Sequence, residues 1–177
     1  PEVLKVIWER LAVEAGVEIL LHTWVTGVQM HAGRMTAVRM WNKGGESVVE
    51  AGAFVDASGD ADLCAMAGAA YEDANSTPNL QSLSTIFRVA NVEVDRAAKL
   101  PKPELWALRR KAATSGAFRL PRLEGSWHRT PHPGVVTVHM TRVPNVDATD
   151  PRQLTQAELE GRRQVQAVLG SHSDELV

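Results

Sequence analysis

Residues 52–68, with the sequence Gly-Ala-Phe-Val-Asp-Ala-Ser-Gly-Asp-Ala-Asp-Leu-Cys-Ala-Met-Ala-Gly, constrain the fold more than any other part of the chain. Residues 53–57 are typical of a short buried strand, and residues 61–67 of a helix that Gly68 ends. A glycine turn between a strand and a helix lets a ligand approach the backbone and its free amides. Such a turn also arises for local reasons, with Asp60 capping the helix. Both interpretations stay open.

The composition is that of a globular protein. The chain has 177 residues, of which 44% are hydrophobic, and a formal net charge of -2, so one domain or two small subdomains are expected. The charge gives no basis for binding nucleic acid, and no apolar run is long enough to span a membrane. Because Cys64 is the single cysteine, an internal disulfide is excluded and a cytoplasmic location is expected. A helical pattern already begins at Pro1, and we expect a fragment whose N- and C-terminal neighbours are missing.

The first third of the chain combines a helix with several strands. Residues 2–15 carry apolar side chains at helical spacing, and Gly16 is suited to end that helix. Residues 17–22 form a continuous apolar run, which is typical of a strand buried on both faces of a parallel sheet. Three further strands, joined by glycine-containing turns, are expected at residues 25–31, 35–42 and 46–50. The sequence therefore predicts an antiparallel meander inserted between two parallel strands.

The rest of the chain predicts a mixture of strands and helices. Strands are expected at residues 80–92 and 135–143, and helices at residues 102–114 and 154–169. Thr155 and Glu158 form a capping-box pattern at the start of the last helix. Residues 118–133 show no clear period.

Three segments, taken in order, resemble one family. They are Glu-Ala-Gly-Val-Glu-Ile-Leu-Leu-His-Thr (residues 14–23), Val-Asp-Ala-Ser-Gly-Asp-Ala-Asp-Leu (residues 55–63) and Thr-Arg-Val-Pro-Asn-Val-Asp-Ala-Thr-Asp-Pro-Arg-Gln-Leu-Thr-Gln-Ala-Glu (residues 141–158). Together with the meander, they resemble the FAD-dependent oxidoreductases of the glutathione-reductase-like class, which have two dinucleotide-binding domains. The chain departs from the family's pattern in two respects. It contains no G-x-G-x-x-G loop for the pyrophosphate, and we expect the C-terminal segment that reaches the flavin ribityl chain and ring in this family to be missing.

The resemblance implies an α/β fold with three parts. Residues 1–72 would form the C-terminal part of an FAD/NAD(P)-binding, Rossmann-like domain with an inserted three-stranded β-meander. Residues 73–150 would form an α+β substrate or cap subdomain, and residues 151–177 a helix returning toward the FAD domain. The function implied is that of an FAD-dependent oxidoreductase, which transfers hydride or electrons between a small organic substrate and the flavin. We expect the fragment to be inactive alone.

The resemblance also implies which residues touch the cofactor. The adenine would pass the start of the meander, and the adenosine-pyrophosphate side would lie along the glycine turn. The cofactor-binding residues implied are Val25, Thr26, Ala57, Ser58, Gly59 and Asp60. A carboxylate repels a pyrophosphate, so Asp60 is better suited to cap the helix or to accept a ribose hydroxyl.

The substrate-binding candidates are cationic or titratable residues in the second half of the chain. They are Arg88, His132, His139 and Arg142. Arginine binds carboxylates bidentately and imidazole exchanges protons near neutral pH, but the same residues also occur on ordinary exposed surfaces. No metal is expected, because the aspartates at positions 56, 60 and 62 do not match a calcium loop. The catalytic residue and the electron acceptor stay open.

Two other functions remain as alternatives. The first is a non-catalytic α/β interaction module that has lost cofactor binding. The second is a dehydrogenase that uses a nicotinamide cofactor alone, against which the inserted meander argues. An upstream glycine-rich loop would distinguish the flavoenzyme from the interaction module.

Overall fold

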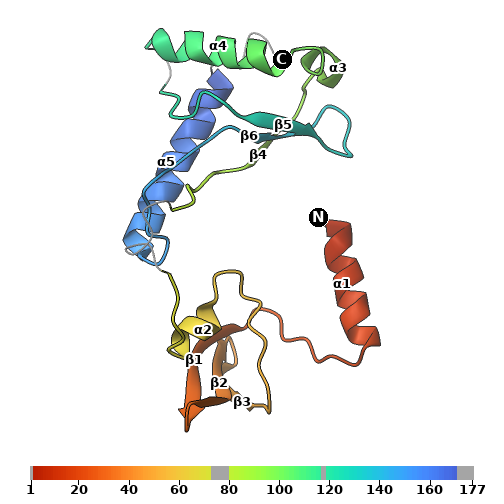
Figure 1. Ribbon diagram of the computed structural model, residues 1–177. Helices are drawn as coiled ribbons and strands as arrows, with labels where there is room; N and C mark the ends of the chain where they lie inside the picture. The colour runs from red at the N-terminus through yellow and green to blue at the C-terminus, as the bar shows by residue number, and fades with distance from the viewer. Residues whose placement is uncertain (1, 73–79, 117–118, 171–177) are drawn as a thin grey trace. The chain divides into compact units, whose positions relative to one another are not determined.

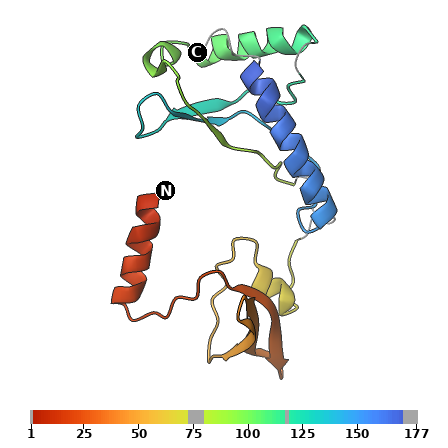
Figure 2. The same cartoon turned by 180° about the vertical axis from the view of Figure 1, so that it is seen from behind.

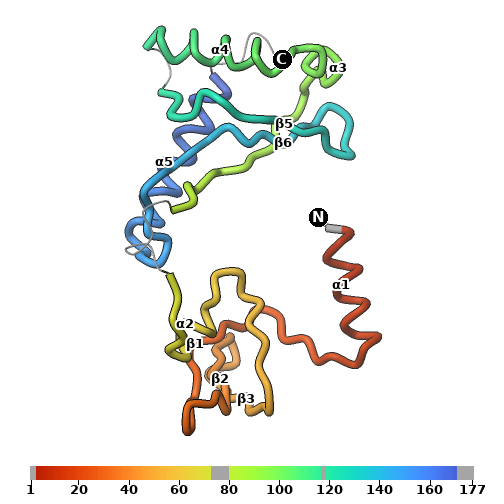
Figure 3. The backbone as a smooth tube through the Cα atoms, in the orientation of Figure 1, coloured from red at the N-terminus to blue at the C-terminus, as the bar shows by residue number. Residues whose placement is uncertain are grey.

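The computed structural model describes residues 2–72, 80–116 and 119–170 (Figure 1). The chain divides into two compact units, Pro1–Tyr71 and Glu72–Val177. Each unit contains one small antiparallel sheet of three strands together with helices, so the fold is mixed α/β. Figure 3 traces the backbone through both units.

The first unit contains the predicted meander. Its strands are β1 (Trp24–His31), β2 (Arg34–Asn42) and β3 (Gly45–Glu50), which pair in the order β1-β2-β3. Ala32 and Gly33 form the first turn with φ of 48° and 77°, the left-handed conformations that a tight hairpin turn requires. The prediction of an antiparallel meander is therefore confirmed.

Two helices flank the meander in sequence, α1 (Glu2–Glu14) and α2 (Asp62–Met66). Each ends at a glycine of positive φ, Gly16 at 74° and Gly68 at 80°. In α1 the amide of Val17 donates to Ala12 O and that of Gly16 to Val13 O, which is a Schellman ending. Both predicted glycine stops are confirmed.

The two parallel strands expected on either side of the meander do not form. Residues 17–22 and 53–57 are irregular, and neither segment pairs with another strand within the described residues. Val55 is 89% exposed, so the expectation of a buried strand at this position is wrong. Both segments are mainly apolar in sequence, but a strand also needs a partner that supplies its backbone hydrogen bonds.

The second unit packs helices against one face of its sheet (Figure 2). The strands β4 (Phe87–Val89), β6 (Val136–His139) and β5 (Ser126–Arg129) lie side by side in that order, all antiparallel. The helices are α3 (Val94–Ala97), α4 (Lys102–Thr114) and α5 (Pro151–Gly170). The core combines β6 with these helices and with the loop before β5, and its buried residues are Val92, Ala97, Leu105, Leu120, Val136, Val138, Met140 and Val168.

The two long strands predicted in this unit are shortened by a threonine. Thr141 is fully buried, and its Oγ1 accepts from Thr85 N at 2.8 Å and donates to Thr85 O at 3.0 Å. The hydroxyl therefore replaces a backbone pairing. Beyond it, Leu83 and Val143 form an isolated antiparallel bridge. The helix at residues 102–114 is confirmed, whereas β5 and α3 were not predicted.

The last helix begins at Pro151, before the expected start. Asp150 caps it, because its Oδ1 accepts from Arg152 N at 2.8 Å. Thr155 lies inside the helix, where its hydroxyl donates to Pro151 O at 2.6 Å, so the predicted capping box is wrong. Gly161 lets α5 lie directly on Thr85, since a Cβ at this position would collide with the threonine hydroxyl.

A buried arginine holds the irregular segment that precedes β5. Arg109 of α4 is 1% exposed and donates to the carbonyls of Arg122, Leu123 and Met140. Burial, and to a lesser extent the charge of Arg122, lower the pKa of Arg109 to about 10. The guanidinium is therefore still charged at neutral pH, and it orders this segment through its carbonyl groups.

Candidate functional site

A β-bulge marks the start of the meander, where adenine contact is expected. Val25 pairs with Met40 and Gly27 with Arg39, which leaves Thr26 as the extra residue of β1. The Thr26 hydroxyl lies 3.4 Å from Arg39 O. Bulges redirect a strand and remove a residue from the ladder. Thr26 is therefore outside the regular pairing of β1 with β2. A residue that contacts a ligand through its backbone needs such a position.

Arg39 places a positive charge beside this bulge. Its guanidinium lies across Gly27, where a Cβ would collide with the terminal nitrogen. Arg39 has no ion-pair partner among residues 2–72, 80–116 and 119–170. Sequence reasoning did not single it out, because nothing in the pattern of β2 sets it apart from other exposed cations.

Asp56 organises the turn that leads into α2. Its Oδ1 accepts from Ser58 N at 3.0 Å and from Ser58 Oγ at 2.7 Å, and its Oδ2 accepts from Cys64 N at 3.0 Å. These bonds, led by the one from the Ser58 hydroxyl, hold the pKa of the Asp56 carboxyl well below its usual range. Asp56 was considered from sequence only as a metal ligand. The Asp-x-Ser spacing, which is typical of an Asx turn, is the sequence signal for its two bonds from Ser58.

Ser58 connects the Asp56 carboxylate to the start of helix α2. Its Oγ accepts from Asp62 N at 3.0 Å, and the residue before the helix, Ala61, makes no side-chain cap. The interpretation of Asp60 as the helix cap is therefore wrong, because Ser58 takes that place. The carboxylate of Asp60 is exposed and has no partner among the described residues.

Three consecutive backbone amides remain open at this turn. Within the described chain, nothing accepts from the N–H groups of Gly59, Asp60 and Ala61. Gly59 has φ of 97°, and no atom lies within 4 Å of where its Cβ would stand. The helix that follows, α2, packs beside β1 (Figures 1 and 2). The turn and the strand that carries the Thr26 bulge are therefore parts of one compact unit.

The second unit brings two of the four substrate candidates to one sheet face. Arg88 is paired with Thr137, and His139 stands two residues further along β6. Paired residues, and residues two apart on a strand, share a face. On the same face His128 pairs with Thr137, and its Nε2 lies 3.2 Å from Ser126 Oγ. This polar sheet face, formed by Arg88, Ser126, His128, Thr137 and His139, lies opposite the core.

His132 lies apart from that face, in the loop between β5 and β6. The loop lines a pocket of about 310 Å³ together with Asp95 and Arg129, which form an ion pair of 3.0 Å. Thr130 shapes the loop by accepting from His132 N at 3.2 Å and donating to Val135 O at 2.8 Å.

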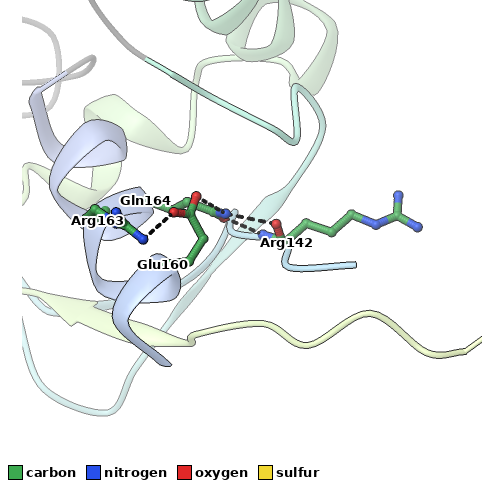
Figure 4. A network of polar contacts seen from close by, with 4 residues as sticks. All are labelled: Arg142, Glu160, Arg163 and Gln164. Carbon is green, nitrogen blue, oxygen red and sulfur yellow. Dashed lines mark hydrogen bonds and ion pairs between the residues drawn. The ribbon is translucent and has the colours of Figure 1, made fainter. Parts of the chain in front are cut away.

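Arg142 is held by its backbone just beyond β6 (Figure 4). Gln164, which is 4% exposed, accepts from Arg142 N at 2.7 Å and donates to Arg142 O at 2.9 Å. Its amide also donates to Glu160, which pairs with Arg163 at 3.0 Å. The Arg142 side chain extends away from this network, and its Nε donates to Ser82 Oγ at 3.1 Å. Sequence patterns do not reveal Gln164, because its partner is 22 positions away.

None of the described helices is long and apolar enough to cross a bilayer. In the same part of the chain, no three His, Cys, Asp or Glu side chains gather as they would around a metal ion.

The sequence was also compared with known proteins. No curated protein and no solved structure matches the chain significantly. The model of the family described as FAD dependent oxidoreductase matches residues 1–176. Since this match covers nearly the whole sequence, the chain belongs to the family of FAD-dependent oxidoreductases.

Proposed function

We propose that this chain is part of a flavoenzyme that oxidises or reduces a small organic substrate. Residues 1–72 would belong to its Rossmann-like FAD domain, residues 73–150 to its substrate domain, and residues 151–177 to the helix leading back to the FAD domain. The flavin, when bound, would supply the hydride or electron transfer. The chain's own residues would hold the cofactor and orient the substrate.

The observation that carries this proposal is the set of open amides at Gly59, Asp60 and Ala61. Amides without partners, at a glycine that lacks a Cβ, allow a polar ligand to approach the backbone closely. We place the adenosine-pyrophosphate side of FAD here, with the Asp60 carboxylate accepting a ribose hydroxyl. The backbone at Val25 and Thr26 would contact the adenine, and the nearby Arg39 would offset the negative charge of the phosphates.

On the substrate side, the polar sheet face is the stronger candidate. Arg88 can bind a carboxylate, and His128 and His139 on the same face can exchange protons. His132 and Arg142, which lie in other parts of the unit, remain weaker candidates. The proposed substrate is therefore a small organic acid.

The first experiment is to express the protein from its complete reading frame and measure its visible flavin absorbance. The proposal predicts a yellow protein, or an apoprotein that binds added FAD in a 1:1 ratio. A folded protein that binds no flavin would refute it.

The substrate is then sought by mixing the oxidised protein anaerobically with a panel of small organic acids, alcohols and amines. Bleaching of the flavin absorbance identifies a substrate. We expect Arg88→Gln to raise KM for an acid substrate and Arg110→Gln, a matched exposed arginine on α4, to leave it unchanged. Equal KM values in both variants would remove Arg88 from the substrate site.

A further inference from the structure

We propose that the groove between α5 and residues 143–146 binds a small organic carboxylate with an apolar chain, and that the carboxylate pairs with Arg152. The groove belongs to the second unit. None of its lining residues is part of the polar sheet face or of the glycine turn. The inference therefore does not rest on the proposed function.

Two glutamines fix the segment that follows β6 along α5. Gln164 bonds to both backbone groups of Arg142, and Gln153 accepts from Asp147 N at 3.1 Å. The segment therefore runs antiparallel to the helix, because its first residue bonds to the later glutamine and its last residue to the earlier one. Positions 153 and 164 are 11 residues apart, which corresponds to about 16 Å along the helix axis. Both ends of the segment are held.

Between these two anchors, the helix and the segment line a groove of about 450 Å³. Asn145, in the middle of the segment, has φ of 58°, a left-handed conformation that asparagine tolerates and that turns the backbone. Val143, Val146 and Ala157 supply an apolar lining, and Ala157 is 6% exposed. Sites for small ligands typically have this size and combine an apolar lining with a few polar groups.

Positive charge follows one side of this groove. Arg152, Gln156 and Arg163 are spaced by four and seven residues, so they share one face of α5. Arg163 pairs with Glu160, which also accepts from Gln164 (Figure 4). Arg152 has no ion-pair partner in the described ranges 2–72, 80–116 and 119–170. The uncompensated charge of the groove is therefore that of Arg152, near the start of the helix.

An apolar lining with one free guanidinium at its end is complementary to a monocarboxylate that carries an apolar chain. A guanidinium binds a carboxylate through two parallel hydrogen bonds. The side-chain amides of Gln156 and Asn145 form no bond within the described part of the chain, so they remain available as donors. A protein partner would need about 20–30 residues on each side, whereas nine residues line this groove. A small molecule is therefore the better fit.

The experiment titrates butyrate, hexanoate and octanoate into the full-length protein and measures Kd by ligand-observed NMR. We expect each added methylene to lower Kd by about two- to fourfold, because it adds apolar surface over the valines and Ala157. Hexan-1-ol, which has the chain without the charge, should bind at least about fivefold more weakly than hexanoate. Val146→Ala should reduce the gain per methylene and keep the preference for hexanoate over hexan-1-ol.

Arg152→Gln tests the charge. The variant keeps the backbone bond from residue 152 to Asp150, and it should raise Kd for hexanoate about fivefold or more while leaving Kd for hexan-1-ol unchanged. Arg162→Gln is the matched control, since Arg162 is an exposed arginine of the same helix outside the groove. It should change both Kd values by less than about twofold.

Arg88→Gln is measured in parallel, because Arg88 is the carboxylate ligand of the proposed substrate site. The inference expects hexanoate to bind this variant as it binds the wild-type protein. A loss of binding in Arg88→Gln together with unchanged binding in Arg152→Gln would place the acid on the polar sheet face and overturn the inference. Absence of binding by all three acids, or an affinity that does not rise with chain length, would overturn it as well.

Discussion

Replacing Gln164 by methionine tests how Arg142 is held. Methionine has a similar length and helix propensity but can neither accept from Arg142 N nor donate to Arg142 O. Both backbone groups would lose their partner beside a side chain that is 4% exposed. Leaving a buried polar group unpaired costs about 1–3 kcal/mol, so the two groups together predict a loss of about 2–6 kcal/mol.

The assay is amide hydrogen exchange of the full-length protein in increasing urea, followed on peptides from β6 and α5. Both peptides should exchange at a lower opening free energy in Gln164→Met, whereas peptides from the meander should be unaffected. Gln156→Met, at an exposed position of the same helix, is the control and should change stability by less than about 0.5 kcal/mol. A loss in Gln164→Met no larger than that of the control would refute the reasoning.

Three further predictions follow from single contacts. Asp150→Ala should lower the melting temperature at pH 7 more than at pH 3. Hydrogen bonds from Arg152 N and from the Gln153 side chain lower the pKa of Asp150 in the folded protein. The stability that the ionised carboxylate contributes is therefore present above the pKa of the unfolded chain and is lost as the pH falls through the pKa of the folded protein. Gly161→Ala should destabilise the protein by about 1–3 kcal/mol through a collision with Thr85, and Thr85→Ala in the same chain should recover part of that loss in urea unfolding. The Asp56 carboxylate raises the pKa of the Cys64 thiol, so iodoacetamide should alkylate Cys64 more slowly than a free cysteine at pH 8, and Asp56→Asn should speed the reaction.

The elements that sequence predicted correctly are those whose signals are local. The strands of the meander are joined at turns where Gly33 and Gly45 have positive φ, and the helices end at residues such as Gly16 and Gly68. In each case the backbone conformation and the residue that permits it are adjacent in sequence. Such signals do not depend on what the rest of the chain does.

The elements that were predicted wrongly depend on distant partners. Residues 17–22 and 53–57 have the composition of buried strands, but pairing partners decide whether a strand forms. Residues 135–143 likewise lose their regular ladder at Thr141, whose hydroxyl bonds to a residue 56 positions away. Composition indicates that such segments are apolar or extended, and it does not indicate which hydrogen bonds they make.

The candidate site shows the same difference between local signals and contacts with distant residues. The turn at Ser58–Asp60 could be identified from its glycine and its position before a helix. The bond between Asp56 and Cys64 N and the bonds of Gln164 could not, because each joins a side chain to the backbone of a residue outside its own turn of structure. Such bonds produce no periodic pattern of residues in the sequence.

The most direct test of the proposed cofactor site is hydrogen exchange of the full-length protein with and without FAD. FAD should slow exchange of the amides of Gly59, Asp60 and Ala61, which have no acceptor among the described residues. Exchange should also slow at the Thr26 bulge and stay unchanged in the loop that carries His132. Protection by FAD elsewhere in the protein, with the turn and the bulge exchanging as fast as before, would contradict the proposed cofactor site.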